Sequence, residues 1–291
     1  MSYQFTVTPN KKVRVIISSD TACEADDPFA IAHALLSPKM DVKAVVAEHF
    51  MQEGSMEQSY AAAGILLGLM KFSVPLLHGQ PWPQDGSLSE GAKCIIDEAR
   101  REDARPLFVL CMGAMTTIAA ALRAAPDIAD KLTVVTIGGR SYSADAAPMR
   151  EFNWGNDPEA INFILRDTKA PVWQIPISGY GMIRVGLAEL QRKVAPCGEV
   201  GAYLLRQMDA YNQTPGAAWT AGESWSLGDN PSVAVVLQPG CGENHMQSAW
   251  LIDEKTAYVQ ELPDRQILVY HTIDNRYVLE DLFAKLAINF G

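Results

Sequence analysis

The regular alternation of short apolar runs with longer helical segments is the feature that most limits how this chain can fold. Val13 to Ile17 is apolar at every position except Arg14, as expected for a buried strand. Pro28 to Leu36 predicts a helix with apolar residues on most faces, and Val42 to Ala47 predicts a second strand. Strand, helix and strand within about 35 residues form a βαβ unit, so the two strands are expected to be parallel.

The same alternation continues along the chain. Further helices are expected at 56–69, 91–101, 117–124 and 159–166, and further strands at 75–77, 107–111, 132–137 and 172–177. No low-complexity segment, linker or sequence repeat interrupts this pattern. We therefore predict one α/β domain that spans residues 1–291 and contains a parallel sheet.

Composition excludes several classes of protein. With 291 residues, 48% of them hydrophobic, the chain can bury a large core. Lys and Arg total 24 against 34 Asp and Glu, and no basic run is present, which argues against nucleic-acid binding. The five cysteines are widely spaced without a CxxC pair, so neither a disulfide framework nor a zinc site is expected.

The sequence also lacks the pattern of a secretory leader and has no run of about 18 apolar residues. We therefore expect a soluble, cytoplasmic protein with no membrane partner.

Polar or glycine-containing stretches follow several predicted strands. They lie at 19–27, 48–50, 112–117 and 138–143. Because ligands of parallel α/β sheets bind outside the carboxyl ends of the strands, these stretches predict a binding site at that edge.

The stretch SDTACEADDPFA, from Ser19 to Ala30, places Asp20, Glu24, Asp26 and Asp27 directly after the first predicted strand. A hard cation such as Ca²⁺ takes six to eight oxygen ligands, and water held on a cation becomes a better nucleophile. Asp20, Asp26 and Asp27 are candidates to supply such oxygens. Alternatively, Asp26 or Asp27 only caps the helix that Pro28 begins, although one cap does not require four acids.

Two later segments add candidate residues. In REFNWGNDPEA, Glu151 and Asn153 lie two positions apart, so in an extended segment they would point the same way and could bind adjacent hydroxyls. Asp157 in the same segment is expected to start a helix. Asp229, in a Gly-Asp-Asn-Pro turn, would by itself also be interpreted as a helix cap.

These segments occur together in a recognisable order. The DD pair before an apolar helix, GAMTTIAAAL, GGR, EFNWGNDPEA and GDNPSVAVVL resemble the nucleoside hydrolase superfamily, the inosine/uridine-preferring nucleoside N-ribohydrolases. The resemblance extends from about Val13 to the segment DNRYVLEDLFAKL and covers nearly the whole chain. It implies an open, mostly parallel sheet flanked by helices, a bound Ca²⁺ and hydrolysis of an N-glycosidic bond. In that mechanism the metal holds the attacking water and ribose hydroxyls, and an Asp takes the proton of the water.

The acidic loop departs from the family pattern Asp-x-Asp-Pro-Gly-x-Asp-Asp. A gap-free alignment from the DD pair puts Ala22 at the position of the general base, whereas an alignment of the strand ends puts Asp20 there. We prefer the second, which makes the loop two residues longer and resembles a divergent nucleoside-hydrolase-like branch. It implies that Asp20 is the base and a metal ligand, and that Asp27 is a second ligand. Asp26 would bind the water on the metal or a sugar hydroxyl.

Glu24 is left open as an additional ligand, an added base or a salt-bridged loop residue. By the same resemblance, Asp229 is the distal metal ligand and Met112 contributes a backbone oxygen. Glu151 and Asn153 match residues that bind the sugar. His49 and Asp145 stand where the family has Asn, and both are interpreted as polar sugar contacts.

Gly228 is the larger departure, because members of the family commonly have a His there that assists the leaving base. Trp225 is the preferred residue to bind the base, by stacking, and core packing is its alternative. Other candidates for leaving-group activation are Glu223, Trp154, His245 and His78.

Three functions are compatible with this pattern. The first is metal-dependent hydrolysis of a ribonucleoside or related N-ribosyl compound, with Ca²⁺ favoured over Mg²⁺. The second is hydrolysis of a different ribosyl or glycosyl substrate, and the third is a catalytically weak homologue that binds metal and sugar. The resemblance also implies a role in purine or pyrimidine salvage and a homo-oligomer, either dimer or tetramer.

Overall fold

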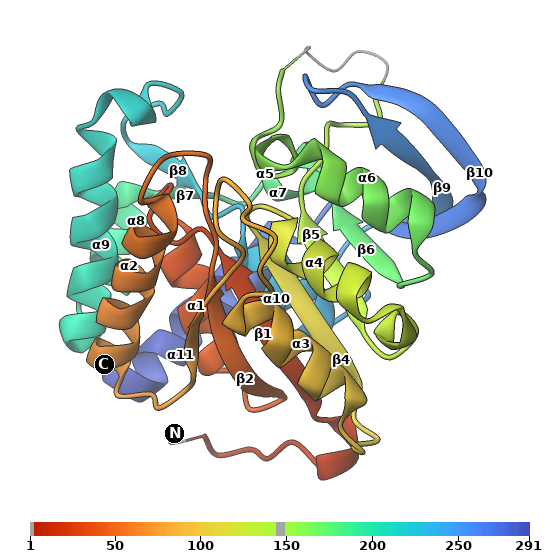
Figure 1. Ribbon diagram of the computed structural model, residues 1–291. Coiled ribbons are helices and arrows are strands. Elements are labelled where there is room, and N and C mark those ends of the chain that lie inside the picture. The colour runs from red at the N-terminus through yellow and green to blue at the C-terminus, as the bar shows by residue number, and fades with distance from the viewer. Residues whose placement is uncertain (1–2, 144–148) are drawn as a thin grey trace.

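A computed structural model describes residues 3–143 and 149–291 of the chain (Figure 1). Its main sheet has eight strands in the order β3-β2-β1-β4-β5-β6-β10-β9. The strands are β1 Val13–Ser19, β2 Met40–Ala47, β3 Leu76–His78, β4 Leu107–Met112, β5 Thr133–Ile137, β6 Val172–Ile175, β9 Asn244–Ile252 and β10 Tyr258–Tyr270. All neighbours are parallel except β9 and β10, which form an antiparallel pair.

Helices cover both faces of this sheet (Figure 1). They are α1 Asp27–Leu35, α2 Ser55–Met70, α3 Glu90–Arg100, α4 Thr116–Ala124, α5 Phe152–Asn156, α6 Pro158–Asp167, α7 Ile177–Tyr180, α8 Leu187–Lys193, α9 Gly198–Asn212, α10 Asn230–Leu237 and α11 Asn275–Phe290. A small antiparallel ribbon, β7 Arg184–Gly186 and β8 Ser224–Ser226, stands apart from the main sheet. The predicted fold class, an open and mostly parallel sheet flanked by helices, is confirmed.

The core is divided by the sheet, as the alternation of side chains along β1 illustrates. Val15 and Ile17 join the apolar cluster that contains α1, α2, α9, α10 and α11, whereas Ile16 joins the cluster that contains α3, α4 and α6. Because successive strand residues point to opposite faces, a strand covered on both faces is continuously apolar. This explains why β1 is apolar at consecutive positions from Val15 to Ile17.

The strand order places the carboxyl end of β1 at the point where the chain changes direction across the sheet. From β1, the order runs to β2 and β3 on one side and to β4, β5 and β6 on the other. Ser19, the last residue of β1, pairs with Ala47 of β2 and with Met112 of β4. The residues that follow these strands therefore meet at a topological switch point, where open α/β sheets bind their ligands.

Several elements after β6 have no counterpart in the sequence-based prediction, including α7, the β7–β8 ribbon, α9 and the β9–β10 hairpin. None of the helices in the described residues is both long and apolar enough to cross a membrane.

Candidate active site

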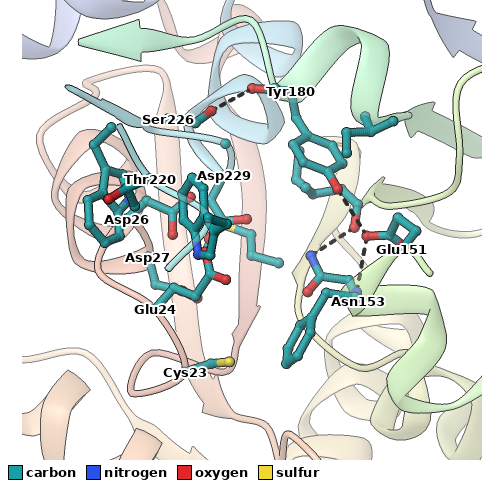
Figure 2. Close-up of a pocket in the computed structure, with 18 of the residues that line it drawn as sticks. Cys23, Glu24, Asp26, Asp27, Glu151, Asn153, Tyr180, Thr220, Ser226 and Asp229 are labelled. Atoms are coloured by element: carbon teal, nitrogen blue, oxygen red, sulfur yellow. Dashed lines mark hydrogen bonds between the residues drawn. The ribbon is translucent and has the colours of Figure 1, made fainter. Parts of the chain in front are cut away.

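A cavity of about 680 Å³ lies at the carboxyl ends of the central strands. Its walls come from the acidic loop after β1, the end of β4, the segment 149–153, the segment 177–184 and the segment 219–229. Figure 2 shows the acidic residues Glu24, Asp26, Asp27 and Asp229 on one side and Glu151 and Asn153 on the other. The predicted site residues that line the cavity are Asp20, Glu24, Asp26, Asp27, Met112, Glu151, Asn153, Trp225 and Asp229.

Three buried carboxylates form the tightest group. Asp26, Asp27 and Asp229 each offer an oxygen, and these oxygens lie within 4.8 Å of one another. In residues 3–143 and 149–291, no Lys or Arg forms an ion pair with any of these three residues. Buried carboxylates without cationic partners must either keep protons or bind a cation.

Asp26 and Asp229 precede helices but do not cap them. Asp26 stands at the N-cap position of α1 and Asp229 at that of α10, and neither side chain makes a capping hydrogen bond. Burial raises the pKa of the Asp26 carboxylate, and nearby backbone amides, among them those of Gly228 and Asp229, partly offset this rise. Helix capping therefore does not explain why carboxylates occupy positions 26 and 229. The amino ends of both helices face the group, where the helix dipoles favour negative charge.

Burial and mutual repulsion raise the pKa values of the acids in this region. Burial raises the pKa of Asp26 to about 6, and burial together with Asp26 raises that of Asp27 to about 8. The pKa of Glu24 is raised to about 8 by burial and by Asp26 and Asp27. The pKa of Asp229 is raised well above its usual range, and its carboxylate lies in hydrogen-bonding contact with that of Asp27. A divalent cation would replace the protons that these groups otherwise keep, and an all-oxygen donor set fits Ca²⁺ or Mg²⁺.

Asp20 lies at the end of β1, next to this group rather than within it. Its Oδ2 atom is buried and has no hydrogen-bond partner among residues 3–143 and 149–291. A Cβ added at Gly113 would lie 2.9 Å from Asp20 Cγ, so the glycine allows the backbone after β4 to approach this side chain. Ala22, which the gap-free alignment would place at the base position, does not line the cavity.

Glu151 and Asn153 are close together, but the expected extended segment is wrong. Glu151 is the N-cap of α5, and its side chain accepts hydrogen bonds from the backbone amides of Asn153 and Trp154. A capping carboxylate satisfies amides that the first turn of a helix leaves unpaired, which favours a helix over a strand here. The Asn153 Nδ2 atom donates to the carbonyl of Ile137 at 3.0 Å. Asp157 caps α6 through the amide of Ala160, as expected.

His49 is buried beside the cavity but does not line it. Its Nε2 atom lies 2.8 Å from Thr116 Oγ1, and its ring stacks on Trp82 with the centroids 4.9 Å apart. The adjacent Glu48, which the sequence analysis did not select, is fully buried and accepts hydrogen bonds from Ser18 and Thr117. Asp145 lies outside the described residues.

The alternatives for leaving-group activation are separated by position. Trp225 forms part of the cavity wall, and its buried Nε1 atom has no hydrogen-bond partner in the described part of the chain. Trp154 is buried and donates from Nε1 to Thr136 Oγ1, so it packs in the core. The remaining candidates do not line the cavity: Glu223, His78 and His245.

Other residues that line the cavity were not predicted from the sequence, and they include Tyr180, Met182, Arg184 and Trp219. The first three follow β6 and belong to α7, to the turn after it and to the start of β7. The signal that marked the other loops, a polar and glycine-bearing stretch after a predicted strand, is also present in SGYG at 178–181. Trp219 lies in an irregular segment before β8, for which the sequence offers no comparable signal.

The sequence matches the family described as "Inosine-uridine preferring nucleoside hydrolase" over residues 15–266. The chain belongs to this family. The match confirms the resemblance inferred from the motifs and the expected class of enzyme, a glycosidase that acts on N-ribosyl bonds.

Curated relatives are distant. The chain is 29% identical over 123 residues to an inosine-uridine preferring nucleoside hydrolase of Leishmania major, which covers 41% of this chain and 38% of that protein. It is 23% identical over 246 residues to the pyrimidine-specific ribonucleoside hydrolase RihA of Salmonella typhimurium. This alignment covers 74% of this chain and 76% of that protein.

Solved structures share the fold over nearly their whole length. A plant nucleoside hydrolase matches with a TM-score of 0.75 at 18% identity and covers 96% of this chain and 99% of that one. A purine-preferring ribonucleoside hydrolase from Gardnerella vaginalis matches with a TM-score of 0.73 at 21% identity and covers 94% and 98%. At these identities the likeness concerns the fold, and the substrate must be inferred from the cavity.

Proposed function

We propose that this chain hydrolyses the N-glycosidic bond of a ribonucleoside, with a bound Ca²⁺ and with Asp20 as the general base. The observation that carries the proposal is the buried group of Asp26, Asp27 and Asp229 beside the unpartnered Oδ2 of Asp20. Together with membership of the nucleoside hydrolase family, this arrangement supports a hydrolytic site rather than a purely structural acidic cluster.

Asp27 and Asp229, with Asp20 and the backbone carbonyl of Met112, are the residues that would hold the cation. They line one cavity and provide only oxygen donors, which suits a hard divalent ion. When bound, Ca²⁺ would polarise a water molecule and sugar hydroxyls and neutralise the charge of the acids. Asp26, whose carboxylate lies near the backbone amides of Gly228 and Asp229, would contact that water or a hydroxyl of the sugar.

Asp20 would remove the proton from the attacking water. A general base must present a free acceptor within hydrogen-bonding distance of the water, and the buried Oδ2 of Asp20 has no competing donor among the residues that the structure describes. The pKa of Asp20 is raised by burial and by Asp27, and the positive charge of a cation would lower it again so that the carboxylate can accept a proton.

The leaving base would lie against Trp225 and Trp219, whose rings meet edge to face with centroids 5.1 Å apart. Both line the cavity, and an aromatic wall suits a flat heterocycle. The unpartnered Nε1 of Trp225 can donate a hydrogen bond to an acceptor on the base. This would stabilise negative charge on the departing base, in the absence of a histidine at Gly228.

The test is to incubate the purified protein with a panel of purine and pyrimidine ribonucleosides and to measure the release of reducing sugar. Parallel samples contain a Ca²⁺ chelator, followed by addition of excess Ca²⁺ or Mg²⁺. Chelator-sensitive turnover that Ca²⁺ restores is expected. Binding of nucleosides without turnover across the whole panel would instead favour a catalytically weak homologue.

A different N-glycosyl substrate is the second candidate, and the mouth of the cavity favours it. Met149, Met182 and Trp219 line the cavity and are 41%, 50% and 51% exposed, which is unusual for large apolar side chains. They would pack against an apolar substituent on the leaving group. Faster turnover of nucleosides whose base carries such a substituent would support this candidate, and slower turnover would contradict it.

A further inference from the structure

We propose that the hydroxyl of Tyr180, supported by Glu151, binds a hydroxyl of the sugar in place of the Glu151 carboxylate. This inference rests on the proposed function and names the residue that selects the sugar.

The carboxylate of Glu151 has no free acceptor position for a substrate. Its Oε2 accepts from the amides of Gly139 at 2.9 Å and Trp154 at 3.0 Å. Its Oε1 accepts from the amide of Asn153 at 3.1 Å and from the Tyr180 hydroxyl at 3.3 Å. A carboxylate offers about four lone-pair positions, and all are used by these donors. Because Glu151 is also 0% exposed, a sugar hydroxyl could bond to it only by displacing one of them.

Tyr180 is the one donor of the four that is not a backbone amide, and it lines the cavity. A carboxylate that remains ionised only accepts hydrogen bonds, so the hydroxyl hydrogen of Tyr180 points to Glu151 and the oxygen lone pairs remain available. The partner of this oxygen must therefore donate a hydrogen, as a sugar hydroxyl does. An ether oxygen or a fully ionised phosphate has no hydrogen to donate. Burial and the nearby Glu151 raise the pKa of Tyr180, so the hydroxyl keeps its hydrogen at neutral pH.

The ring of Tyr180 lies between the acidic group and Glu151. A Cβ added at Gly228 would be 3.1 Å from Tyr180 Cδ2 and 3.3 Å from Asp26 Oδ2, so the ring and this carboxylate lie on either side of one small space. The Ser226 hydroxyl donates to the Tyr180 carbonyl at 3.2 Å and fixes the backbone (Figure 2). A sugar held at the acidic group would therefore contact the Tyr180 hydroxyl before it could contact Glu151. The glycine at 228 also leaves the space that this ring uses.

The experiment compares wild type with Tyr180→Phe on the best ribonucleoside and on its 2′-, 3′- and 5′-deoxy analogues. The measured quantity is kcat/KM, or the inhibition constant for an analogue that is not turned over. Tyr203→Phe is the matched control, because Tyr203 is a half-buried tyrosine of α9 that does not line the cavity. We expect Tyr180→Phe to lower kcat/KM for the parent about tenfold, the loss typical of one hydrogen bond. For the one deoxy analogue that lacks the hydroxyl bound by Tyr180, the substitution should cause almost no further loss of kcat/KM.

Losses that are equal for the parent and all three analogues would overturn the inference, because they would indicate a purely structural effect of Tyr180. An effect of Tyr203→Phe with the same selectivity would overturn it as well. If wild type hydrolyses ribonucleosides but Tyr180→Phe has no selective effect, this inference is overturned and the proposed function is not. Failure of wild type to hydrolyse any ribonucleoside would overturn the proposed function and this inference together.

Discussion

The aspartates in and near the site share one chemical type but have different surroundings. Asp157 uses its carboxylate to cap α6, whereas Asp26 and Asp229, at the same kind of position, make no capping hydrogen bond. Asp20 keeps a buried oxygen that no other described residue contacts by a hydrogen bond. These four aspartates thus make different contacts, because their neighbours in space differ.

Asp20→Asn tests the role of the free oxygen. An amide cannot take a proton from water, so kcat should fall by about 10²–10⁴-fold, the range for loss of a general base. The variant should remain folded, as circular dichroism can check. Asp130→Asn, at an exposed position, removes the same charge and should leave kcat unchanged. Full activity of Asp20→Asn would show that the strand-end alignment of the loop is wrong.

Glu48→Gln tests a buried acid outside the acidic group. Burial raises the pKa of Glu48 to about 7 in the folded protein from an ordinary value of 4.5. The folded state then keeps a proton that the unfolded chain has already released. Stability from this group is therefore present below about pH 4.5 and is lost as the pH rises through about 7.

Between pH 5 and pH 8, the free energy of unfolding of wild type should fall by about 2–3 kcal/mol more than that of Glu48→Gln. Urea unfolding in the presence of chelator measures this difference. Glu102→Gln, at an exposed position, should behave like wild type. A parallel pH dependence of wild type and Glu48→Gln would contradict the expectation.

At the scale of elements, the site is built where helices begin. α1 and α10 start at the acidic group, and α5 starts at Glu151 on the opposite side of the cavity. The amino end of a helix presents unpaired backbone amides and a partial positive charge, and both suit carboxylates. Local folding of these helices therefore fixes the position of the acids.

Removal of the α5 cap should destabilise the protein. Glu151→Ala leaves three backbone amides without their acceptor, from Gly139, Asn153 and Trp154, and should lower the free energy of unfolding by about 2–3 kcal/mol. Ser89→Ala, which removes a cap of α3 with one hydrogen bond, should cost only about 1 kcal/mol. Urea denaturation compares the two variants. Equal losses would mean that the Glu151 contacts contribute little beyond a single cap.

At the scale of the whole molecule, the acidic group joins distant parts of the chain. Asp26 and Asp27 follow β1 near the amino terminus, whereas Asp229 precedes α10 in the last third of the sequence. α1 and α10 pack against each other, so a cation between these acids would tie the two helices together. Binding of that cation should therefore stabilise the entire fold.

Addition of Ca²⁺ to the chelator-treated protein should raise its melting temperature. The increase should be larger at pH 8 than at pH 6, because the ligands must lose protons to bind the metal and the pKa of Asp27 is raised to about 8. Differential scanning fluorimetry at several Ca²⁺ concentrations measures the shift. Asp229→Asn should abolish most of it, and Asp130→Asn should not change it. A shift that survives in Asp229→Asn would place the cation elsewhere.

The sequence by itself determined the alternation of strands and helices up to β6, except for α5, because periodic apolar patterns and Pro at a helix start act over a few neighbouring residues. It also determined the family, through an ordered set of motifs. The tertiary structure decided which acids come together, that Asp20 stands beside the group and that Glu151 accepts from four donors. It also brought Tyr180 to the site. These outcomes depend on strand order and on contacts between segments far apart in the chain, and no local pattern encodes such distances.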